Sequence, residues 1–186
     1  FRANIREGSS FGVSCRIGGE VEDSVFNSYS NKYHDGFIGH AYVGSWVNLG
    51  AMTTNSDLKN DYTNVKVNLD GKLHESGSSK VGAIIGDFVK TSIGTLINTG
   101  SVIGSCSMTV FSGRMTPDFI PPFSLFIKNK LRTVKSFDSV IATIKTQMNR
   151  RGCNLSPANE SILKNLYEKT LDNNLRTFEE WNKKLN

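Results

Sequence analysis

The chain has 186 residues, a formal net charge of +5, seventeen glycines and only four prolines. This length suits one core with an appendage, because single domains commonly hold roughly 100–200 residues. No apolar run reaches the ~18 residues that a membrane-spanning helix needs, and residues 1–10 lack the apolar segment of a signal peptide. We therefore expect neither a membrane span nor a signal peptide in these residues. Since the chain starts without methionine and enters its repeats almost at once, we expect it to be the second half of a longer protein.

The positive charge and the cysteines indicate no special ligand. Residues 128–186 hold twelve Lys or Arg and six Asp or Glu, but these charges alternate along helical stretches without an aromatic platform. A solvated helical face accounts for such a pattern better than a nucleic-acid surface. Cys15, Cys106 and Cys153 show no CxxC spacing, which predicts free thiols in a reducing cytoplasm rather than a metal site or a disulfide framework.

In two stretches of the chain every sixth residue is apolar or β-branched, often with glycine directly after it. Neither a strand nor a helix alone keeps returning one residue to the inside every six. Short strands joined by tight corners do, and three such sides make a coil of about eighteen residues. A β-sandwich with chance spacing is the alternative, but the regularity favours a parallel β-helix of hexapeptide repeats. The repeating residues are Ile5, Phe11, Ile17, Ile38, Val43, Leu49, Ile85, Thr91, Ile97, Ile103 and Thr109.

Residues 51–80 interrupt this period and are polar. Within them, residues 65–69 alternate in polarity and end at Asp70-Gly71, which predicts a β-hairpin. We expect a loop with a short hairpin that projects from the prism, between coils formed by residues 1–50 and 81–112. Loops held by a rigid scaffold often carry binding groups.

Beyond the second stretch the period ends. Residues 119–123 form an apolar segment broken by prolines, which we expect to cover the open end of the prism. Two helices should follow, one capped by Ser136 and the other by the Ser-Pro pair at residues 156–157. We therefore divide the chain into a β-helix domain, residues 1–123, and a C-terminal helical extension, residues 124–186, with a role in packing or oligomerisation.

A prism has no cleft of its own, so a site must form between prisms or beneath the projecting loop. His34 lies where the repeat is interrupted, and the ordinary pKa of a histidine, near ~6.5, suits a general base at neutral pH. A solvated, idle loop histidine is the alternative. His34 and His40 flank Gly39, and His74 falls in the hairpin. This spacing does not favour zinc, and we predict no metal.

The polar loop also holds several lysines, among them Lys59 and Lys66. Its simplest interpretation is a solvated insertion of mixed charge. The functional alternative is a site for a phosphorylated or anionic substrate, because lysines bind phosphate as point charges.

Two segments of the chain resemble a known family. Residues 33–44 read YHDGFIGHAYVG, and residues 47–55 read VNLGAMTTN. A histidine, an aromatic–aliphatic–Gly step, an aliphatic–Gly pair, Asn-aliphatic-Gly-Ala and a later asparagine follow one another in this order. The pattern resembles the left-handed β-helix half of the bifunctional sugar-1-phosphate nucleotidyltransferase/acetyltransferases, which make UDP-N-acetylglucosamine. The likeness resumes at residues 65–68 and 82–87 and covers roughly residues 5–112.

The resemblance implies left-handed coils, a homotrimer, and acetyl-CoA as the co-substrate, with an amino sugar phosphate such as glucosamine-1-phosphate as the acceptor. By position, His34 is implied as the general base that deprotonates the sugar amine as it attacks the thioester. Asn55 takes the position of an asparagine that contacts the acceptor, and Lys66 that of a lysine near the phosphate. Tyr33 and Lys59 are further substrate-binding candidates. We expect His34 to face the loop of residues 51–80, with Asn55 and Lys66 pointing into the same space.

The chain also departs from the family. The nucleotidyltransferase domain of the family, with its Gly-rich loop, has no counterpart in these residues, which predicts acyl transfer alone. Met52 stands where the family usually has glycine, and Phe37 where several members have tyrosine. A second function therefore stays open, in which the β-helix is a non-catalytic module that holds upstream domains together as a trimer or binds a regulatory ligand.

Overall fold

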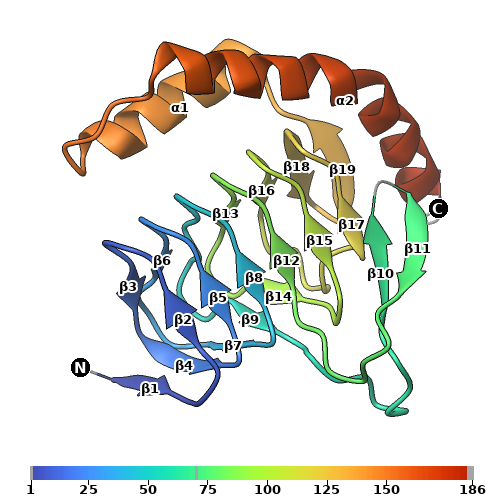
Figure 1. Ribbon diagram of the computed structural model, residues 1–186. Helices are drawn as coiled ribbons and strands as arrows, with labels where there is room; N and C mark the ends of the chain where they lie inside the picture. The colour runs from blue at the N-terminus through green and yellow to red at the C-terminus, as the bar shows by residue number, and fades with distance from the viewer. Residues whose placement is uncertain (1, 70, 184–186) are drawn as a thin grey trace.

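The computed structural model describes residues 2–69 and 71–183. Its body is a β-helix in which short strands of successive coils stack in parallel along one axis (Figure 1). The left-handed parallel β-helix predicted from the period and the resemblance is confirmed, as are the two C-terminal helices, which lie along one side of it. Among the described residues, no helix has the length and apolar character needed to cross a membrane.

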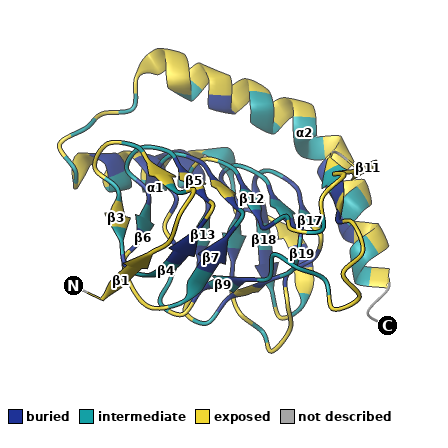
Figure 2. Ribbon diagram, turned by 60° about the horizontal axis from the view of Figure 1, so that its bottom comes forward, coloured by how far each residue is buried: buried dark blue, intermediate teal, exposed yellow. Residues whose placement is uncertain are grey.

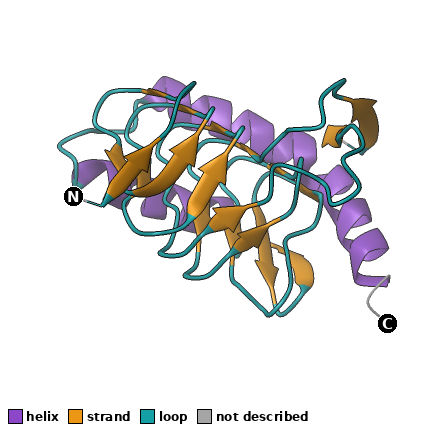
Figure 3. Ribbon diagram, turned by 90° about the horizontal axis from the view of Figure 1, so that it is seen from below, coloured by secondary structure: helices purple, strands orange, loops and turns teal. Residues whose placement is uncertain are grey.

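Three faces make up the prism, and Figure 3 shows their strands repeating along the axis. The first face holds β1 (Ala3–Ile5), β4 (Gly19–Glu22), β7 (Phe37–Gly39), β9 (Thr54–Asn55) and β14 (Leu96–Ile97). The second holds β2 (Ser10–Phe11), β5 (Val25–Phe26), β8 (Tyr42–Val43), β12 (Ile84–Ile85), β15 (Val102–Ile103) and β17 (Phe119–Ile120). The third holds β3 (Arg16–Ile17), β6 (Asn31–Lys32), β13 (Lys90–Thr91), β16 (Met108–Thr109) and β18 (Ser124–Ile127). Isolated bridges at Asn48 join β6 to β13.

One residue of each prism strand points inward and builds the core. Figure 2 shows dark blue, buried stretches in the strands of the central coils. Ile38, Val43, Ile85, Ile97 and Ile103 are all fully buried, as the period predicts. The glycine after the inward residue gives adjacent coils room to approach. A Cβ atom on Gly44, for example, would lie 2.7 Å from the backbone nitrogen of Asp87 in the next coil. Burial of these inward side chains supplies the main stabilisation of the coil.

The corner between the second and third faces carries a column of large side chains on left-handed backbone. Tyr29, Trp46, Phe88, Cys106 and Phe123 all have φ between 56° and 64°, a region that ordinarily favours glycine. The rings of Tyr29 and Trp46 stack 4.2 Å apart, and the whole column packs in one apolar cluster with the helices. Burial raises the pKa of the Cys106 thiol to about 12. This packing offsets the cost of the left-handed backbone.

An insertion leaves the prism after β9 and returns before β12. It contains the predicted hairpin, formed by β10 (Lys66–Leu69) and β11 (Lys72–Glu75) in antiparallel pairing. Asp70, at the predicted turn, lies outside the described residues. Residues 51–55, which we assigned to the loop, belong instead to the coil, because β9 pairs in parallel with β14.

The C-terminal end of the prism differs from the sequence prediction. Phe119 and Ile120, expected to cover the end, form β17 and pair in parallel with β15. The coil then continues into β18, beyond the boundary expected at residue 123, because β18 pairs in parallel with β16. The hairpin of β18 with β19 (Lys130–Thr133) and the end of α2 (Pro157–Lys183) cover this end of the core.

Helix α1 (Phe137–Asn149) lies along the aromatic corner. Ser136 caps it as predicted, with its side chain accepting a hydrogen bond from the Ser139 amide. Val140, Ile141, Ile144 and Met148 turn inward onto the corner column. These apolar residues, spaced three and four apart, form one stripe and thus fix which side of α1 faces the prism.

Candidate active site

Tyr33 and His34 lie on the corner where β6 turns from the third face into the first. Both side chains are exposed, and their rings meet edge to face, with centroids 5.4 Å apart. His34 is therefore accessible to a ligand and is not buried against its own core. A histidine so placed is free to exchange a proton with a bound substrate.

A groove of about 860 Å³ runs between the outer side of the third face and helix α1, and Tyr33 and His34 both line it. Four basic side chains share it, whereas no Asp or Glu is found among the described residues that form its lining. Partial burial lowers the pKa of Lys90, which sits on the floor of the groove. The cations are Arg16, Lys90, Arg150 and Arg151. A groove of this charge attracts an anionic ligand.

Residues of α1 and of the turn after it anchor this wall to the prism. The Arg151 guanidinium donates to the Ser14 carbonyl at 2.6 Å and lies 5.9 Å from the centre of the Tyr29 ring. The Gln147 side chain donates to the Trp46 carbonyl, also at 2.6 Å. The helical extension, which the sequence analysis assigned to packing or oligomerisation, therefore also forms one side of the groove.

Asn55 does not join this groove, which corrects its assignment as a substrate contact. It is 1% exposed and points into the coil. Its amide oxygen accepts from the Gly39 amide at 2.9 Å, and its amide nitrogen donates to the carbonyls of Gly39 and Ser56. All of its polar atoms thus serve the coil, and it ties β9 to β7 where backbone pairing between them is replaced by side-chain bonds.

Lys59 and Lys66 line a second groove, of about 510 Å³, between the insertion and the coil. Each already has an acidic partner within the insertion: Lys59 lies 3.7 Å from Asp61, and Lys66 lies 2.7 Å from Glu75. The Glu75 carboxylate also raises the pKa of Lys66. Within one chain, the structure therefore separates these two lysines from His34, contrary to the expectation of a shared space.

Lys32, which the sequence analysis did not select, lies directly beneath the His34 corner. Its side chain points into the coil, and its ammonium donates to the carbonyls of Gly18 at 2.7 Å and His34 at 3.0 Å. The six-residue period contains the signal that identifies it, since Lys32 follows Phe26 by six residues and precedes Ile38 by six.

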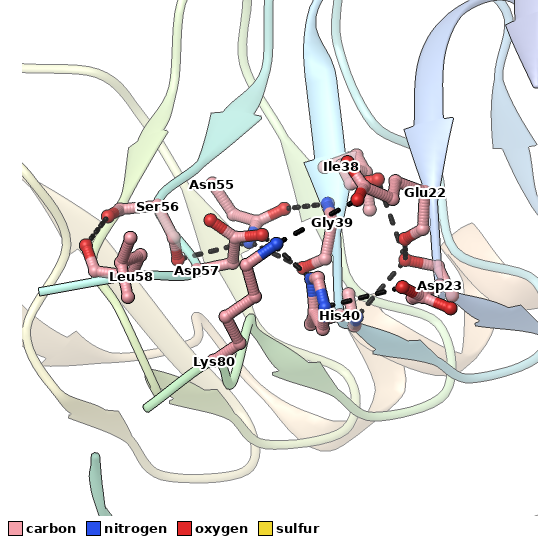
Figure 4. Close-up of polar contacts among 12 residues, drawn as sticks. Glu22, Asp23, Ile38, Gly39, His40, Asn55, Ser56, Asp57, Leu58 and Lys80 are labelled. Atoms are coloured by element: carbon pink, nitrogen blue, oxygen red, sulfur yellow. Dashed lines mark hydrogen bonds and ion pairs between the residues drawn. The ribbon is translucent and has the colours of Figure 1, made fainter. Parts of the chain in front are cut away.

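His40 belongs to a different cluster, at the corner between the first and second faces (Figure 4). Its Nδ1 lies 2.7 Å from Asp57, and its Nε2 lies 3.4 Å from Asp23. Glu22, Asp23 and His40 are close enough together to surround one cation. The Glu22 carboxylate, however, is paired with Arg6 and lies 3.9 Å from Lys80. The cluster is thus an ion-pair network at the neck of the insertion, where Asp57 and Lys80 begin and end it. His74 lies apart from this network on β11.

The coil and its period place the chain in the class of hexapeptide-repeat β-helices. No family model matches it. It is 40% identical over 86 residues to a bifunctional sugar-1-phosphate nucleotidylyltransferase/acetyltransferase from Sulfurisphaera tokodaii, covering 46% of this chain and 21% of that protein. It is 29% identical over 135 residues to the bifunctional protein GlmU of Thermotoga sp. (strain RQ2), covering 72% of this chain and 26% of that protein. The resemblance stated from the sequence is confirmed.

The chain spans only 21% to 26% of the length of these curated relatives. A solved hexapeptide-repeat acetyltransferase from Vibrio cholerae, complexed with acetyl coenzyme A, is 19% identical and aligns with a TM-score of 0.28 over 72% of this chain and 70% of that one. The relative from Sulfurisphaera tokodaii is named for an acetyltransferase activity as well as for nucleotidyl transfer, and this chain matches a part of it.

Proposed function

We propose that this chain transfers an acetyl group from acetyl-CoA to the amine of an amino sugar phosphate, with His34 as the general base. The observation that carries the proposal is the first groove, where an accessible histidine shares a channel with four cations and with no carboxylate among the described lining residues. Both substrates of such a reaction are phosphorylated, so the groove has the charge that they need.

His34 supplies the minimum chemistry for this reaction. An ammonium group is not nucleophilic, so the sugar amine must lose a proton as it attacks the thioester carbonyl. The new C–N bond forms while the C–S bond breaks, and coenzyme A leaves as a thiolate that becomes the thiol when the imidazolium returns the amine proton to it. A histidine within hydrogen-bond reach takes the amine proton, and the rest of the catalysis is positioning of the two substrates in the groove. Tyr33, whose ring contacts that of His34, is the neighbouring group that would contact the acceptor.

The four cations suit the coenzyme more than the acceptor, because acetyl-CoA carries a diphosphate and a 3′-phosphate. Arg150 and Arg151 follow directly on α1, whereas Arg16 and Lys90 stand on the third face. Phosphates held between these two walls would receive charge-assisted hydrogen bonds from both sides. No metal takes part in this proposed transfer step.

A homotrimer is also part of the proposal. The outward residues of the second face form an apolar row across five adjacent strands: Val25, Tyr42, Ile84, Val102 and Phe119. Val25 and Tyr42 are 43% and 46% exposed. A continuous apolar row of this kind suits contact between copies of the chain. The same row would serve a non-catalytic trimerisation module, which is the competing function.

Thiol release from acetyl-CoA in the presence of glucosamine-1-phosphate separates these two functions. His34→Ala should lower kcat by about 10²-fold or more, whereas His74→Ala, at an exposed position on the hairpin, should leave it unchanged. Wild-type protein without activity on any amino sugar phosphate, or activity that survives His34→Ala, would sink the catalytic proposal and leave the module.

A further inference from the structure

Lys32 is the one lysine whose side chain the fold encloses among the residues that the structure describes. It is only 2% exposed. On the same face, the inward positions of the neighbouring coils are Ile17 and Leu49, both apolar. A lysine at this position has to be explained, because burying an ammonium costs far more than burying an aliphatic side chain of similar length.

The ammonium has two partners, and both lie at the corner that carries His34. It donates to the Gly18 carbonyl at 2.7 Å and to the His34 carbonyl at 3.0 Å. The backbone makes room for it at Gly19, where a Cβ atom would stand 2.6 Å from the Lys32 nitrogen. The charge therefore sits in a cradle of backbone atoms beneath residues 33–36.

Burying the Lys32 ammonium at this place costs free energy. Burial lowers the pKa of Lys32 to about 8, and the carboxylates of Asp35 and Glu20 only partly oppose that shift. A methionine would fill the same volume without this penalty. The ammonium does what no aliphatic side chain can do, since it hydrogen-bonds the backbone of two adjacent coils at once.

The corner above Lys32 depends on such a tie. Tyr33, His34 and Asp35 all point outward and are exposed. Gly36 has φ of 126°, a conformation that side chains avoid. Between Lys32 and the next inward residue, Ile38, no side chain anchors this segment in the core. Backbone bonds from the Met52 and Glu20 amides hold the carbonyls of Asp35 and Gly36, and the bond from the ammonium holds the His34 carbonyl itself.

We infer that Lys32 is a positioning residue, whose enclosed ammonium fixes the backbone that carries the proposed general base His34. The inference rests on the proposed function for its effect on catalysis, but not for its effect on the corner. Without the ammonium, the carbonyls of Gly18 and His34 lose their partner and residues 33–36 gain freedom. The imidazole then spends less time at the distance and angle that proton transfer needs.

Three variants test this inference in the full chain. Lys32→Met removes the donor, whereas Lys32→Gln keeps an amide donor, and both side chains are one bond shorter than that of lysine. Thr109→Val is the matched control, because Thr109 is an inward, 2% exposed polar residue of the same face that lines neither groove. Circular dichroism and the thermal midpoint establish whether each variant keeps the fold.

The first measurement needs no activity. Amide hydrogen exchange of Glu20 and Met52, whose amides donate to the carbonyls of Gly36 and Asp35, should become at least tenfold faster in Lys32→Met when followed by NMR, with Lys32→Gln between it and wild type. Exchange in the other coils, and everywhere in Thr109→Val, should stay unchanged. Exchange of these two amides that is unchanged in Lys32→Met would overturn the inference. So would uniform acceleration through all coils in both Lys32 variants, because that result marks a role in stability alone.

The second measurement is acetyl transfer. We expect Lys32→Met to lower kcat by ~10-fold to 10²-fold with the KM for acetyl-CoA within twofold, and Lys32→Gln to recover part of the loss. A fall confined to KM would contradict a positioning role. If the wild-type protein itself transfers no acetyl group, the proposed function fails, and the exchange experiment still decides whether Lys32 holds the corner.

Discussion

The two grooves of this molecule both contain lysines or arginines, yet they differ in what surrounds those charges. In the groove beside α1, none of the four cations forms a salt bridge with any residue that the structure describes. In the groove beside the insertion, Lys59 and Lys66 both have acidic partners. A cation already neutralised by the fold has little to offer an anionic ligand. The comparison teaches that lysine content alone does not identify a phosphate site.

The largest expected effect on stability concerns helix α1, which forms one wall of the first groove. Trp46→Ala should lower the free energy of unfolding by about 3–4 kcal/mol, because Trp46 is 8% exposed and joins the corner to α1. Leu73→Ala, on the hairpin beside the second groove, should change it by less than about 0.5 kcal/mol, since Leu73 is 66% exposed. Urea unfolding measures both. Equal losses in the two variants would show that α1 is not docked on the corner.

Charge reversal tests the comparison directly. Arg150→Glu should raise the KM for acetyl-CoA by roughly tenfold, because it removes a charge-assisted contact and adds repulsion. Lys66→Glu, in the second groove, should change this KM by less than about twofold. The coenzyme would belong in the second groove if the two variants responded in the reverse order. Raising the salt concentration should weaken binding in wild type more than in Arg150→Glu.

The pH dependence of stability isolates the buried charge near the first groove. The folded-state pKa of Lys32 is about 8, against 10.5 for an unperturbed lysine. Between these values the unfolded chain binds more protons than the folded one, so wild-type stability should rise with pH through this window. We expect Lys32→Met to lose about 1–2 kcal/mol of that rise. Chemical denaturation at pH 7.5 and pH 10 provides the measurement, and an equal rise in both proteins would contradict the buried ammonium.

The smallest expected effect lies at the neck of the insertion. Asp57→Ala removes the partner of His40, 2.7 Å away, and should cost about 0.5–1.5 kcal/mol. Proteolysis within residues 56–82 should become faster, because the Asp57 side chain ties the start of the insertion to His40 on the coil. Acetyl transfer in the first groove should be unchanged. A loss of activity here would mean that the two grooves act together.

The six-residue period predicted the coil well, because it reports which side chains must point inward. Counting onward from Leu49 by six gives Asn55, and counting back from Ile38 by six gives Lys32. Both residues are buried as that count requires. The family resemblance instead led us to place Asn55 in the site, since a matched motif says nothing about which way a side chain faces. The six-residue count thus places Lys32 and Asn55 inside the coil, but the sequence analysis applied this count only to apolar and β-branched residues.

The first groove itself was beyond prediction. Its walls come from Arg16 and Lys90 on one side and residues near 150 on the other. Nothing in the local pattern of α1 indicates which corner of the prism it covers, because its apolar stripe fits any apolar surface. The contact depends on the aromatic column at Tyr29 and Trp46. Tyrosine and tryptophan rarely adopt a left-handed backbone conformation, so residue propensities do not predict them at such a corner.

The aromatic corner also limits how this protein can change in length over evolution. Helix α1 has 13 residues, which span about 20 Å, and coils stack about 4.8 Å apart. The helix therefore reaches across about four coils. Duplication of one coil is an easy genetic event in a repeat protein, but here it would shift half of the corner column out of register with α1. A prism with one more coil would need roughly three more residues in α1 at the same time. The length of the helix therefore restricts the number of coils.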